Sequence, residues 1–296
     1  MITNKKNDRV AAIFIHGFFI SLSVMFIVPM LSVIFIAFAN EKDLALNGYP
    51  FSFRSFDVEG FRYVLDNPAT ILNAYKVTII VAITGTFLYL LISTMAAYAL
   101  SRPGFKYKKP LTFFFFFTML FNGGLVPSYI LIKQGLHLGN TYWAMILPAL
   151  VNVWYLIMLK TFLADIPNEI LESARIDGAG HWKIYLRFIL PLSKPALATV
   201  GLLTLLDYWN AWMLAMLYID DKSKYPLQYL LQVMLRNIME ILKDMQNNVP
   251  GAGAAQIPSE SVRMAMCILA VGPMLFIFPF FQKYFTKGLT VGAVKG

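Results

Sequence analysis

Six long apolar runs separated by polar segments dominate the hydropathy pattern of this chain. They cover about residues 10–39, 70–100, 111–132, 141–163, 196–219 and 264–281. About 20 apolar residues in a helix cross the roughly 30 Å hydrocarbon core of a bilayer, so each run is long enough to span once. The pattern predicts an all-α membrane protein with six transmembrane helices, forming one transmembrane domain over residues 1–296.

The first run follows a basic N-terminal segment and ends in the sequence AFA at residues 37–39, which imitates a signal-peptidase site. The apolar part of a cleaved signal has about 7 to 15 residues, and this run is about twice as long. We therefore interpret it as a retained transmembrane helix, with a cleaved signal as the alternative.

The third run opens with five consecutive phenylalanines and is interrupted by Asn122, Gly123, Gly124 and Pro127. Backbone groups freed at membrane depth need partners from protein or water. We expect the break to face a cavity, which makes Asn122 a candidate for a substrate pathway. A plain kink between packed helices is the alternative.

The distribution of charge predicts the orientation in the membrane. The net charge is +9, and residues 101–110 hold four basic residues and no acid. Basic loops favour the cytoplasmic side, so six spans place both termini, residues 165–195 and the tail 286–296 inside. Residues 220–262 then form an extracytoplasmic loop. The basic residues form no patch interleaved with aromatics, so we expect no nucleic-acid partner, only lipid and protein.

Familiar catalytic motifs are missing from the sequence. It has no Walker A loop, no HExxH motif and no repeated Cys/His cluster, and it contains one cysteine and three scattered histidines. Each of these motifs carries a specific chemistry through its spacing. We therefore expect no enzyme activity, no metal site and no cofactor bound by this chain.

The most polar interior stretch, residues 165–195, predicts a short helix-turn-helix. Pro167 suits the first turn of a helix, with the N-cap one or two residues before it, and Ile170, Leu171 and Ala174 form an apolar edge. Gly178 suits the left-handed residue that ends a helix. A second helical piece follows, with Trp182, Tyr185, Phe188 and Ile189 along one side, until Pro191 breaks it.

Charged side chains stand beside small residues on the first helix of this hairpin. Small residues allow another surface to approach the backbone closely, which favours docking of a soluble partner. A hairpin lying on lipid headgroups is the alternative, and the residues alone leave both open. The candidate docking residues are Glu172, Ser173, Ala174, Arg175, Asp177, Gly178 and Ala179.

One acidic residue, Asp207, lies near the middle of the fifth run. An acid there costs about 2.5 to 3.5 kcal/mol to insert and normally faces protein or a water-filled cavity. Tyr208, Trp209, Asn210 and Trp212 follow it and offer ring faces and hydrogen bonds to a sugar. Alternatively, Asp207 and Asn210 bond a neighbouring helix while the tryptophans pack against another subunit. A third interpretation is a proton or ion site of a self-contained secondary transporter.

The hairpin carries a pattern of known permeases. Glu172, Ser173 and Ala174 are followed after three residues by Gly178, and after nine more by the sequence FILP at 188–191. This resembles the EAA-x3-G-x9-I-x-LP pattern of permease subunits of bacterial binding-protein-dependent ABC importers. Ser173 and Phe188 depart from it, but the spacing is kept. Other segments resemble the carbohydrate-uptake branch, in particular its MalG-like permeases of the YtcP/LplC type: NGGLVPSYILIKQGLHLGNTYWAMILP, LPLSKPALAT and YFTKGLTVGAVKG.

The resemblance implies the type I importer permease fold in the bacterial cell membrane. Such a permease pairs with a second homologous permease and imports a carbohydrate, here an oligosaccharide, delivered by an extracytoplasmic binding protein. Two separate ATPase subunits hold ATP and Mg and drive alternating access.

The resemblance also implies which parts of the chain meet those partners. The helix ending at Gly178 would be the coupling helix seated on an ATPase, within the motif that Pro191 closes. A second ATPase contact would be the tail with Lys287, Gly288 and Lys295, for which disorder is the alternative. The loop at residues 247–258 corresponds in position to one that enters the binding protein.

Overall fold

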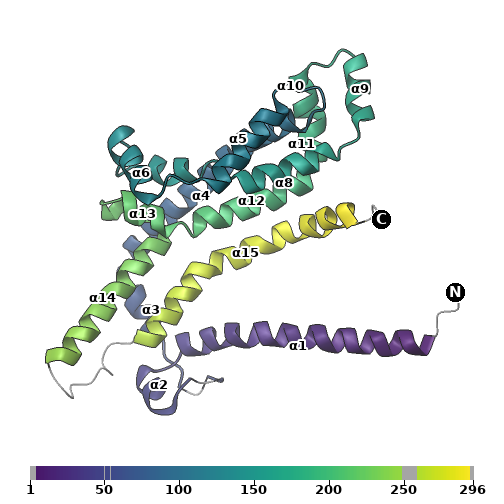
Figure 1. The fold of residues 1–296 in the computed structure, drawn as a ribbon. Coiled ribbons are helices and arrows are strands. Elements are labelled where there is room, and N and C mark those ends of the chain that lie inside the picture. The colour runs from purple at the N-terminus through teal and green to yellow at the C-terminus, as the bar shows by residue number, and fades with distance from the viewer. Residues whose placement is uncertain (1–4, 50, 54, 249–258, 294–296) are drawn as a thin grey trace. The chain divides into compact units, whose positions relative to one another are not determined.

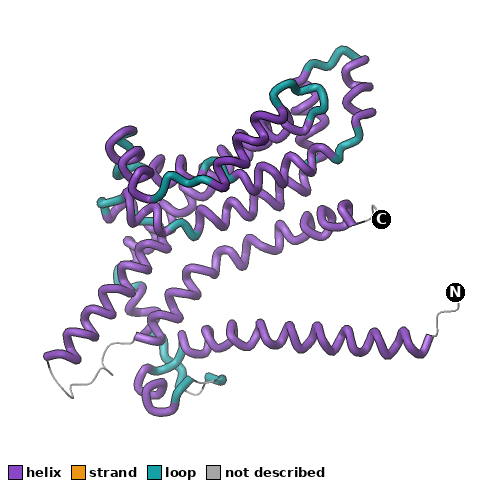
Figure 2. Tube along the Cα trace, viewed as in Figure 1, coloured by secondary structure: helices purple, strands orange, loops and turns teal. Residues whose placement is uncertain are grey.

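The structure is a computed structural model that describes residues 5–49, 51–53, 55–248 and 259–293. Within these ranges the regular structure is helical (Figure 2), apart from one isolated antiparallel bridge between Ala39 and Phe56. The chain divides into two compact units, residues 1–68 with 233–272 and residues 69–232 with 273–296. Each unit is described by itself below.

Three helices are long and apolar enough to cross a membrane without a break. They are α1 (Lys5–Ala37), α4 (Pro68–Ser101) and α15 (Ser259–Ala293), with candidate spans Ala12–Ala37, Pro68–Ser101 and Ser259–Gln282 (Figure 1). Three further helix pairs pass the same test together but are bent, so the described residues contain up to six spans if each pair counts as one. The prediction of six spans holds in that form only.

The predicted break in the third run is confirmed. Helix α5 (Lys108–Leu120) ends before Asn122, and α6 (Leu125–Ile130) starts after Gly124, which has a φ of +91°. A short π-helical turn, Leu131–Gly135, extends α6, and the two halves bend by 109°. The Asn122 side chain accepts a hydrogen bond from the Gly124 N–H at 2.9 Å, which holds the turn.

The fourth run, predicted as a span over residues 141–163, is broken. Helix α7 (Tyr142–Ile146), with a 3-10 turn to Ala149, bends by 53° against α8 (Val153–Ala164). Pro148 lies in the turn and has no N–H to continue the helix. The Tyr89 hydroxyl donates to the Asn152 carbonyl at 2.8 Å, and Tyr208 donates to the Ile146 carbonyl at 2.9 Å. These bonds give the carbonyls at the break hydrogen-bond partners, which they need because lipid offers none.

The fifth run, predicted as a span over residues 196–219, is broken as well, and the bent pair that passes the span test there is His181–Leu192 with Lys194–Trp209, at 77°. Helix α12 (Lys194–Trp209) stops before Asn210, and α13 (Trp212–Tyr218) starts after Ala211. The Asn210 side chain donates to the Leu206 carbonyl at 2.9 Å. An Asn side chain that bonds local backbone competes with helix continuation, so the chain turns without glycine or proline.

In the unit of residues 69–232, α8 contacts both α5 and α12. Its core joins α4, α8, α12 and the hairpin, through Tyr89, Leu159, Ile184, Ile189, Val200 and neighbouring buried residues. Gly85 of α4 faces Tyr208 so closely that an added Cβ would lie 2.5 Å from the tyrosine ring. Only glycine allows α4 and α12 to approach this closely.

In the other unit, the polar segment after α1 holds the start of the last span. It contains α2 (Glu41–Asn47) and α3 (Glu59–Val64). The Glu41 carboxylate accepts backbone hydrogen bonds from Glu260 at 3.0 Å and Ser261 at 3.1 Å. A carboxylate at the positive end of a helix stabilises its first turn. Helix α15 therefore begins at Ser259, earlier than the predicted span.

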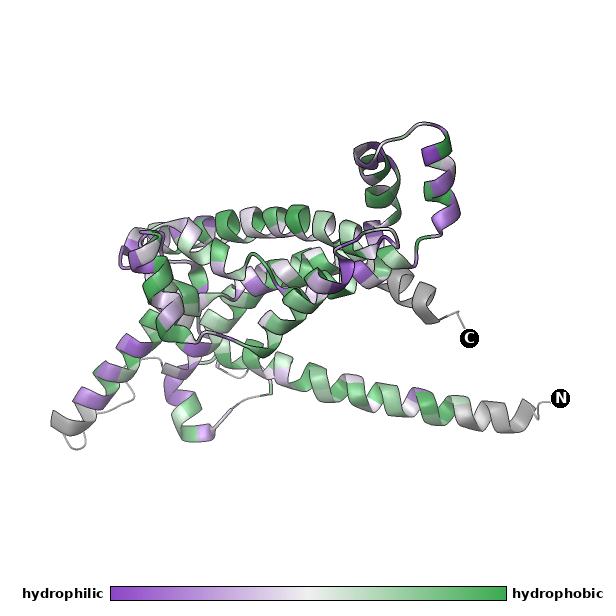
Figure 3. Cartoon of the chain, turned by 45° about the horizontal axis from the view of Figure 1, so that its top comes forward, coloured by the Kyte–Doolittle hydropathy of each residue, from purple (hydrophilic) through white to green (hydrophobic). Residues whose placement is uncertain are grey.

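The predicted loop over residues 220–262 contains a 22-residue amphipathic helix, α14 (Leu227–Asn248). Figure 3 shows polar and apolar residues alternating along its described part. Leu227, Leu231 and Ile238 are buried. Of the loop 247–258, which was predicted to reach the binding protein, residues 247 and 248 end α14 and residues 249–258 lie outside the described residues.

The C-terminal tail is partly helical, because α15 continues to Ala293. Lys287 and Gly288 belong to this helix, but their side chains lie outside the described part, and Lys295 lies outside the described residues. Their contact with an ATPase remains a prediction.

Candidate functional site

The predicted helix-turn-helix is present between α8 and α12. It consists of α9 (Asn168–Ile176) and α10 (His181–Ile184), followed by a π-helical turn at Tyr185–Ile189 and by α11 (Leu190–Leu192). Figure 1 shows α9 and α10 side by side at one end of α8 and α12. We call α9 through α11 the hairpin.

The first helix of the hairpin begins later than we predicted. Pro167 is itself the N-cap, with φ −52° and ψ 130°, and its side chain makes no capping bond. This extended ψ keeps Pro167 outside the first helical turn. We had expected Pro167 to lie inside that turn, with the N-cap one or two residues before it. Ile166, one of those two positions, is instead 8% exposed and packs in the core.

The end of α9 is as predicted. Gly178 has φ +78°, and Asp177 is the C-cap. The Gly178 N–H donates to the Arg175 carbonyl and the Ala179 N–H to the Ala174 carbonyl, both at 2.9 Å. This pair of bonds is a Schellman motif, which needs a left-handed residue and therefore favours glycine.

The two faces of α9 differ sharply in burial. Leu171 and Ala174 are 3% and 5% exposed and join the core with Ile184 and Tyr185. Ile170, predicted on the same edge, is exposed, and Ile176 is 86% exposed. Sequence reasoning missed Ile176, whose only signal was an apolar residue at the end of a polar helix. The anchored helix thus presents charged groups and two apolar side chains, Ile170 and Ile176, to the outside.

The remaining predicted coupling residues lie around this face. Ser173 is exposed and its hydroxyl donates to the Glu169 carbonyl at 2.8 Å. Glu172, Arg175, Asp177 and Pro191 are exposed, whereas Ala179 is half-buried.

The second part of the hairpin is tied to α4. The hydroxyls of Tyr185 and Thr94 are 2.6 Å apart and hydrogen-bonded. Of the residues predicted along one side, Tyr185 and Ile189 are buried, while Trp182 is 64% exposed. Movement of the hairpin would therefore act directly on α4.

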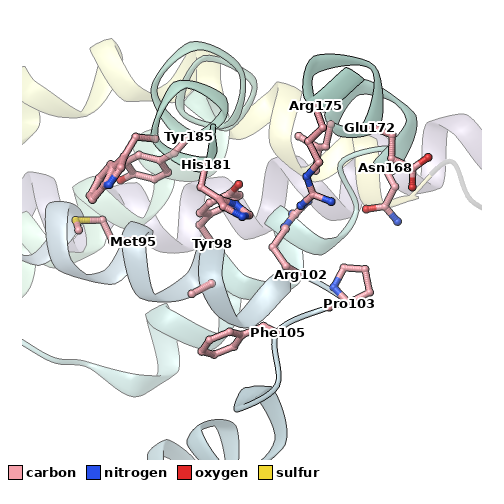
Figure 4. Close-up of a pocket in the computed structure, with 14 residues that line it drawn as sticks. Met95, Tyr98, Arg102, Pro103, Phe105, Asn168, Glu172, Arg175, His181 and Tyr185 are labelled. Carbon is pink, nitrogen blue, oxygen red and sulfur yellow. The ribbon is translucent and has the colours of Figure 1, made fainter. Parts of the chain in front are cut away.

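A cavity of about 760 Å³ lies between the hairpin and the end of α4 (Figure 4). Of the predicted coupling residues, Glu172 and Arg175 line it. Sequence reasoning missed its other walls, which include Met95, Tyr98 and Arg102.

Arg102 locks the end of α4 to α8. Its Nη2 donates to the Leu163 carbonyl at 2.5 Å and its Nε to the Ser101 hydroxyl at 2.9 Å, while Nη1 has no partner within the described ranges. Burial lowers the Arg102 pKa, and the nearby Arg175 lowers it further. Arginine still stays charged near neutral pH. The sequence marked Arg102 only as an orientation signal.

The polar residues of the fifth run separate into two groups. Asp207, in the last turn of α12, and Asn210, which directly follows the helix, are both exposed. Tyr155 lies close enough to the Asp207 carboxylate to interact with it, and Gln228 donates to the Asn210 side chain at 3.2 Å. Both partners were missed, because they are distant in sequence.

The aromatic residues beside them are mostly inside the protein. Tyr208 and Trp209 are 3% and 4% exposed, and Trp212 is half-buried. The described residues contain no group of three or more His, Cys, Asp or Glu side chains placed to hold a metal ion. An exposed carboxylate at membrane depth needs water or another protein surface beside it.

These features define a membrane subunit of a transport system. The chain belongs to the family of binding-protein-dependent transport system inner membrane components, whose model matches residues 2–291. The predicted family and membrane location are thereby confirmed.

Individual relatives match over nearly the whole chain. The chain is 36% identical to the polygalacturonan/rhamnogalacturonan transport system permease protein YtcP of Bacillus subtilis (strain 168), covering 98% of this chain and 99% of the relative. It is 36% identical to Protein LplC of the same organism, over 99% and 97% of the two chains.

A solved structure shows the same fold. A chain from the crystal structure of a bacterial ABC transporter involved in the import of the acidic polysaccharide alginate matches with a TM-score of 0.79 at 25% identity, covering 94% of this chain and 98% of that chain.

Proposed function

We propose that this chain is the transmembrane permease subunit of an ABC importer that brings a carbohydrate, an oligosaccharide, into the cell. The family supports a role with a binding protein. The relative YtcP is a polygalacturonan/rhamnogalacturonan transport permease, and the solved neighbour belongs to a transporter that imports the acidic polysaccharide alginate, which supports a carbohydrate. The chain works with a second permease and an extracytoplasmic binding protein, and two ATPase subunits carry the ATP and Mg.

The observation that carries this proposal is the division of α9 into an anchored and a free face. Leu171 and Ala174 fix it to the core, while Glu172, Arg175 and Ile176 face outward. A Cβ added at Gly178 would meet nothing within 4 Å, so the turn is open to a partner backbone. This face docks in a groove of the ATPase.

The internal bonds of the hairpin support transmission from the ATPase to the membrane helices. Tyr185 connects the hairpin to Thr94 of α4, and Arg102 connects the end of α4 to α8. Closure of the ATPases displaces α9, and these connections carry the displacement to the spans. Access to the carbohydrate site then alternates between the two sides of the membrane.

The proposed topology follows the basic residues. Both termini, residues 101–110, the hairpin and the tail 286–296 lie in the cytoplasm, where basic segments are favoured. Residues 220–262, including α14, lie outside and reach the binding protein. The tail makes a second contact with the ATPases.

The proposed carbohydrate path runs along the exposed side of α12. Asp207 and Asn210 offer hydrogen bonds there, and Trp212 lies beside the same break. Tyr208 and Trp209 support the path from inside the protein, and Asn122 contributes at the break after α5.

The test is substrate-stimulated ATP hydrolysis by the reconstituted importer. Glu172→Lys reverses a charge on the proposed docking face and should lower this activity about tenfold or more. Asp165→Lys reverses a charge at an exposed residue that precedes α9 and lies outside the cavity lining, and should leave most of the activity. Equal activity of both variants, with normal amounts of protein in the membrane, would refute docking through α9.

A second candidate is a self-contained secondary transporter that uses Asp207. The three bent helix pairs and the exposed Asp207 favour testing it, because broken helices line ion sites in such transporters. Vesicles that hold this chain alone should show no uptake under a proton or sodium gradient. Gradient-driven uptake would replace the importer proposal.

A further inference from the structure

A second hollow lies away from the hairpin cavity, between α5 and α8. It is a groove of about 780 Å³ that the proposed coupling mechanism does not use. One end is lined by Lys108, Lys109 and Lys160, and the other by phenylalanines of α5. The groove therefore combines a cationic end with an apolar channel.

The cationic end has no negative charge to balance it. No acidic residue lines the groove, and none of its lysines forms an ion pair within the part of the chain that the structure describes. Lys160 donates to the Thr112 hydroxyl at 3.3 Å and lies close enough to Lys108 for their charges to repel. Lys108 and Lys109 occupy the first turn of α5, where the helix dipole disfavours a cation. An anion at this point relieves both effects.

The apolar end is a column of exposed rings. Phe113, Phe117 and Phe121 follow one another one turn apart along α5, with ring centroids 6.4 Å and 4.4 Å apart. They are 71%, 45% and 64% exposed. From Phe113 to Phe121 the helical rise amounts to about 12 Å, so the column suits an extended hydrocarbon chain.

We propose that this groove binds an anionic phospholipid, with the phosphate at the three lysines and an acyl chain along the phenylalanine column. Basic pockets between membrane helices bind lipid headgroups in this way. A free phosphate would use only the cationic end. An apolar helix of another subunit would cover the rings but would bury the lysines without a counter-charge, which is costly.

The experiment compares lipid retention by the full-length chain, purified with its co-purifying subunits, in two variants. Lys108→Met with Lys160→Met removes two charges and keeps the apolar stems. Lys222→Met, at an exposed residue of the turn Lys222–Lys224, is the matched control. Both are placed in vesicles of phosphatidylcholine alone or mixed equally with phosphatidylglycerol, and bound lipid is measured by mass spectrometry after mild extraction.

Each basic residue near an anionic lipid contributes about fivefold in binding, so the double variant should bind phosphatidylglycerol roughly 30-fold more weakly. Wild type and Lys222→Met should prefer phosphatidylglycerol over phosphatidylcholine. Equal retention by all three proteins, or no headgroup preference, would overturn the proposal. Competition by inorganic phosphate as effective as that by phosphatidylglycerol would show a free-anion site instead.

A second measurement does not depend on the folding of the variant. A photoactivatable phosphatidylglycerol added to the wild-type protein should label peptides of α5 and α8. A photoreactive residue in place of Phe117 that crosslinks to a protein chain, with no label from the lipid, would show that another subunit covers the groove.

Discussion

The hairpin and the break in the fifth run both place polar groups beside buried anchors, but they do so by different means. In the hairpin, Gly178 adopts the left-handed conformation that the turn after α9 requires. The exposed residues lie on a separate face of that helix. At the break, buried Tyr208 and exposed Asp207 are neighbours in the chain. The turn there depends on close packing of α12 against α4.

The two turns differ in which residues determine them, neighbours in the sequence or residues far apart in it. The hairpin is specified locally, by one glycine and its Schellman bonds. The break combines the local bond from Asn210 to the Leu206 carbonyl with tertiary contacts, namely Gly85 against Tyr208 and Tyr208 against the Ile146 carbonyl. Backbone conformation should therefore control the hairpin, and side-chain fit should control the break.

The largest effect is expected at Gly85. Gly85→Leu places atoms where the Tyr208 ring lies and displaces its hydroxyl from the Ile146 carbonyl. Overpacking and the lost hydrogen bond together should cost about 3 kcal/mol of unfolding free energy. Thermal unfolding in detergent measures this cost. Gly17→Leu, in α1 with nothing within 4 Å of its Cβ, is the control and should be nearly neutral. Equal stability of the two variants would contradict the packing explanation.

The next effect isolates backbone conformation in the hairpin. Neither Gly178 nor Gly180 has an atom within 4 Å of an added Cβ, but only Gly178 has a positive φ. Gly178→Ala should therefore cost about 1 to 2 kcal/mol and reduce substrate-stimulated ATP hydrolysis. Gly180→Ala, at the N-cap of α10, should cost less than about 1 kcal/mol and leave hydrolysis unchanged. If the two variants behave alike in unfolding and in hydrolysis, the turn does not depend on the left-handed residue.

A smaller effect is expected where the hairpin meets α4. Tyr185→Phe removes the hydroxyl that bonds Thr94. The Thr94 hydroxyl keeps its second bond, to the Leu90 carbonyl. The loss should be about 1 kcal/mol of stability, with weaker coupling of ATP hydrolysis to uptake. Tyr107→Phe, at a 56% exposed ring, is the control. Unchanged coupling in Tyr185→Phe would show that this hydrogen bond transmits nothing.

The smallest effect on stability is expected at Asp207. Asp207→Asn keeps an acceptor for Tyr155 at an exposed position, so the unfolding midpoint should not move. Carbohydrate uptake should fall about fivefold, as expected for one weakened polar contact of about 1 kcal/mol. Asp165→Asn is the control. Complete loss of uptake would instead indicate an ion or proton site.

The same contrast explains what the sequence could predict. The apolar runs, the break at Asn122 and the hairpin with its Gly178 stop followed from local signals, namely apolar length, glycine and proline. The break after Trp209 did not, because it depends on one Asn side chain and on the packing of Gly85 against Tyr208. At the break after Ala149 the sequence offers Pro148 as a local signal, but the tyrosines that satisfy the freed carbonyls are distant in sequence. The outward position of Ile176 and the cavity beside Arg102 depend on how α9 packs against the core, which no local pattern records.

The Glu41 cap on α15 sets a condition on biosynthesis. Its bonding partners lie 219 and 220 residues further along the chain. At synthesis rates of roughly 5 to 20 residues per second, Glu41 leaves the ribosome on the order of 10 to 40 s before them. During that interval its carboxylate is solvated by water, and the segment that carries it must stay accessible until the last helix is made. Closure of this unit is thus a late step of assembly.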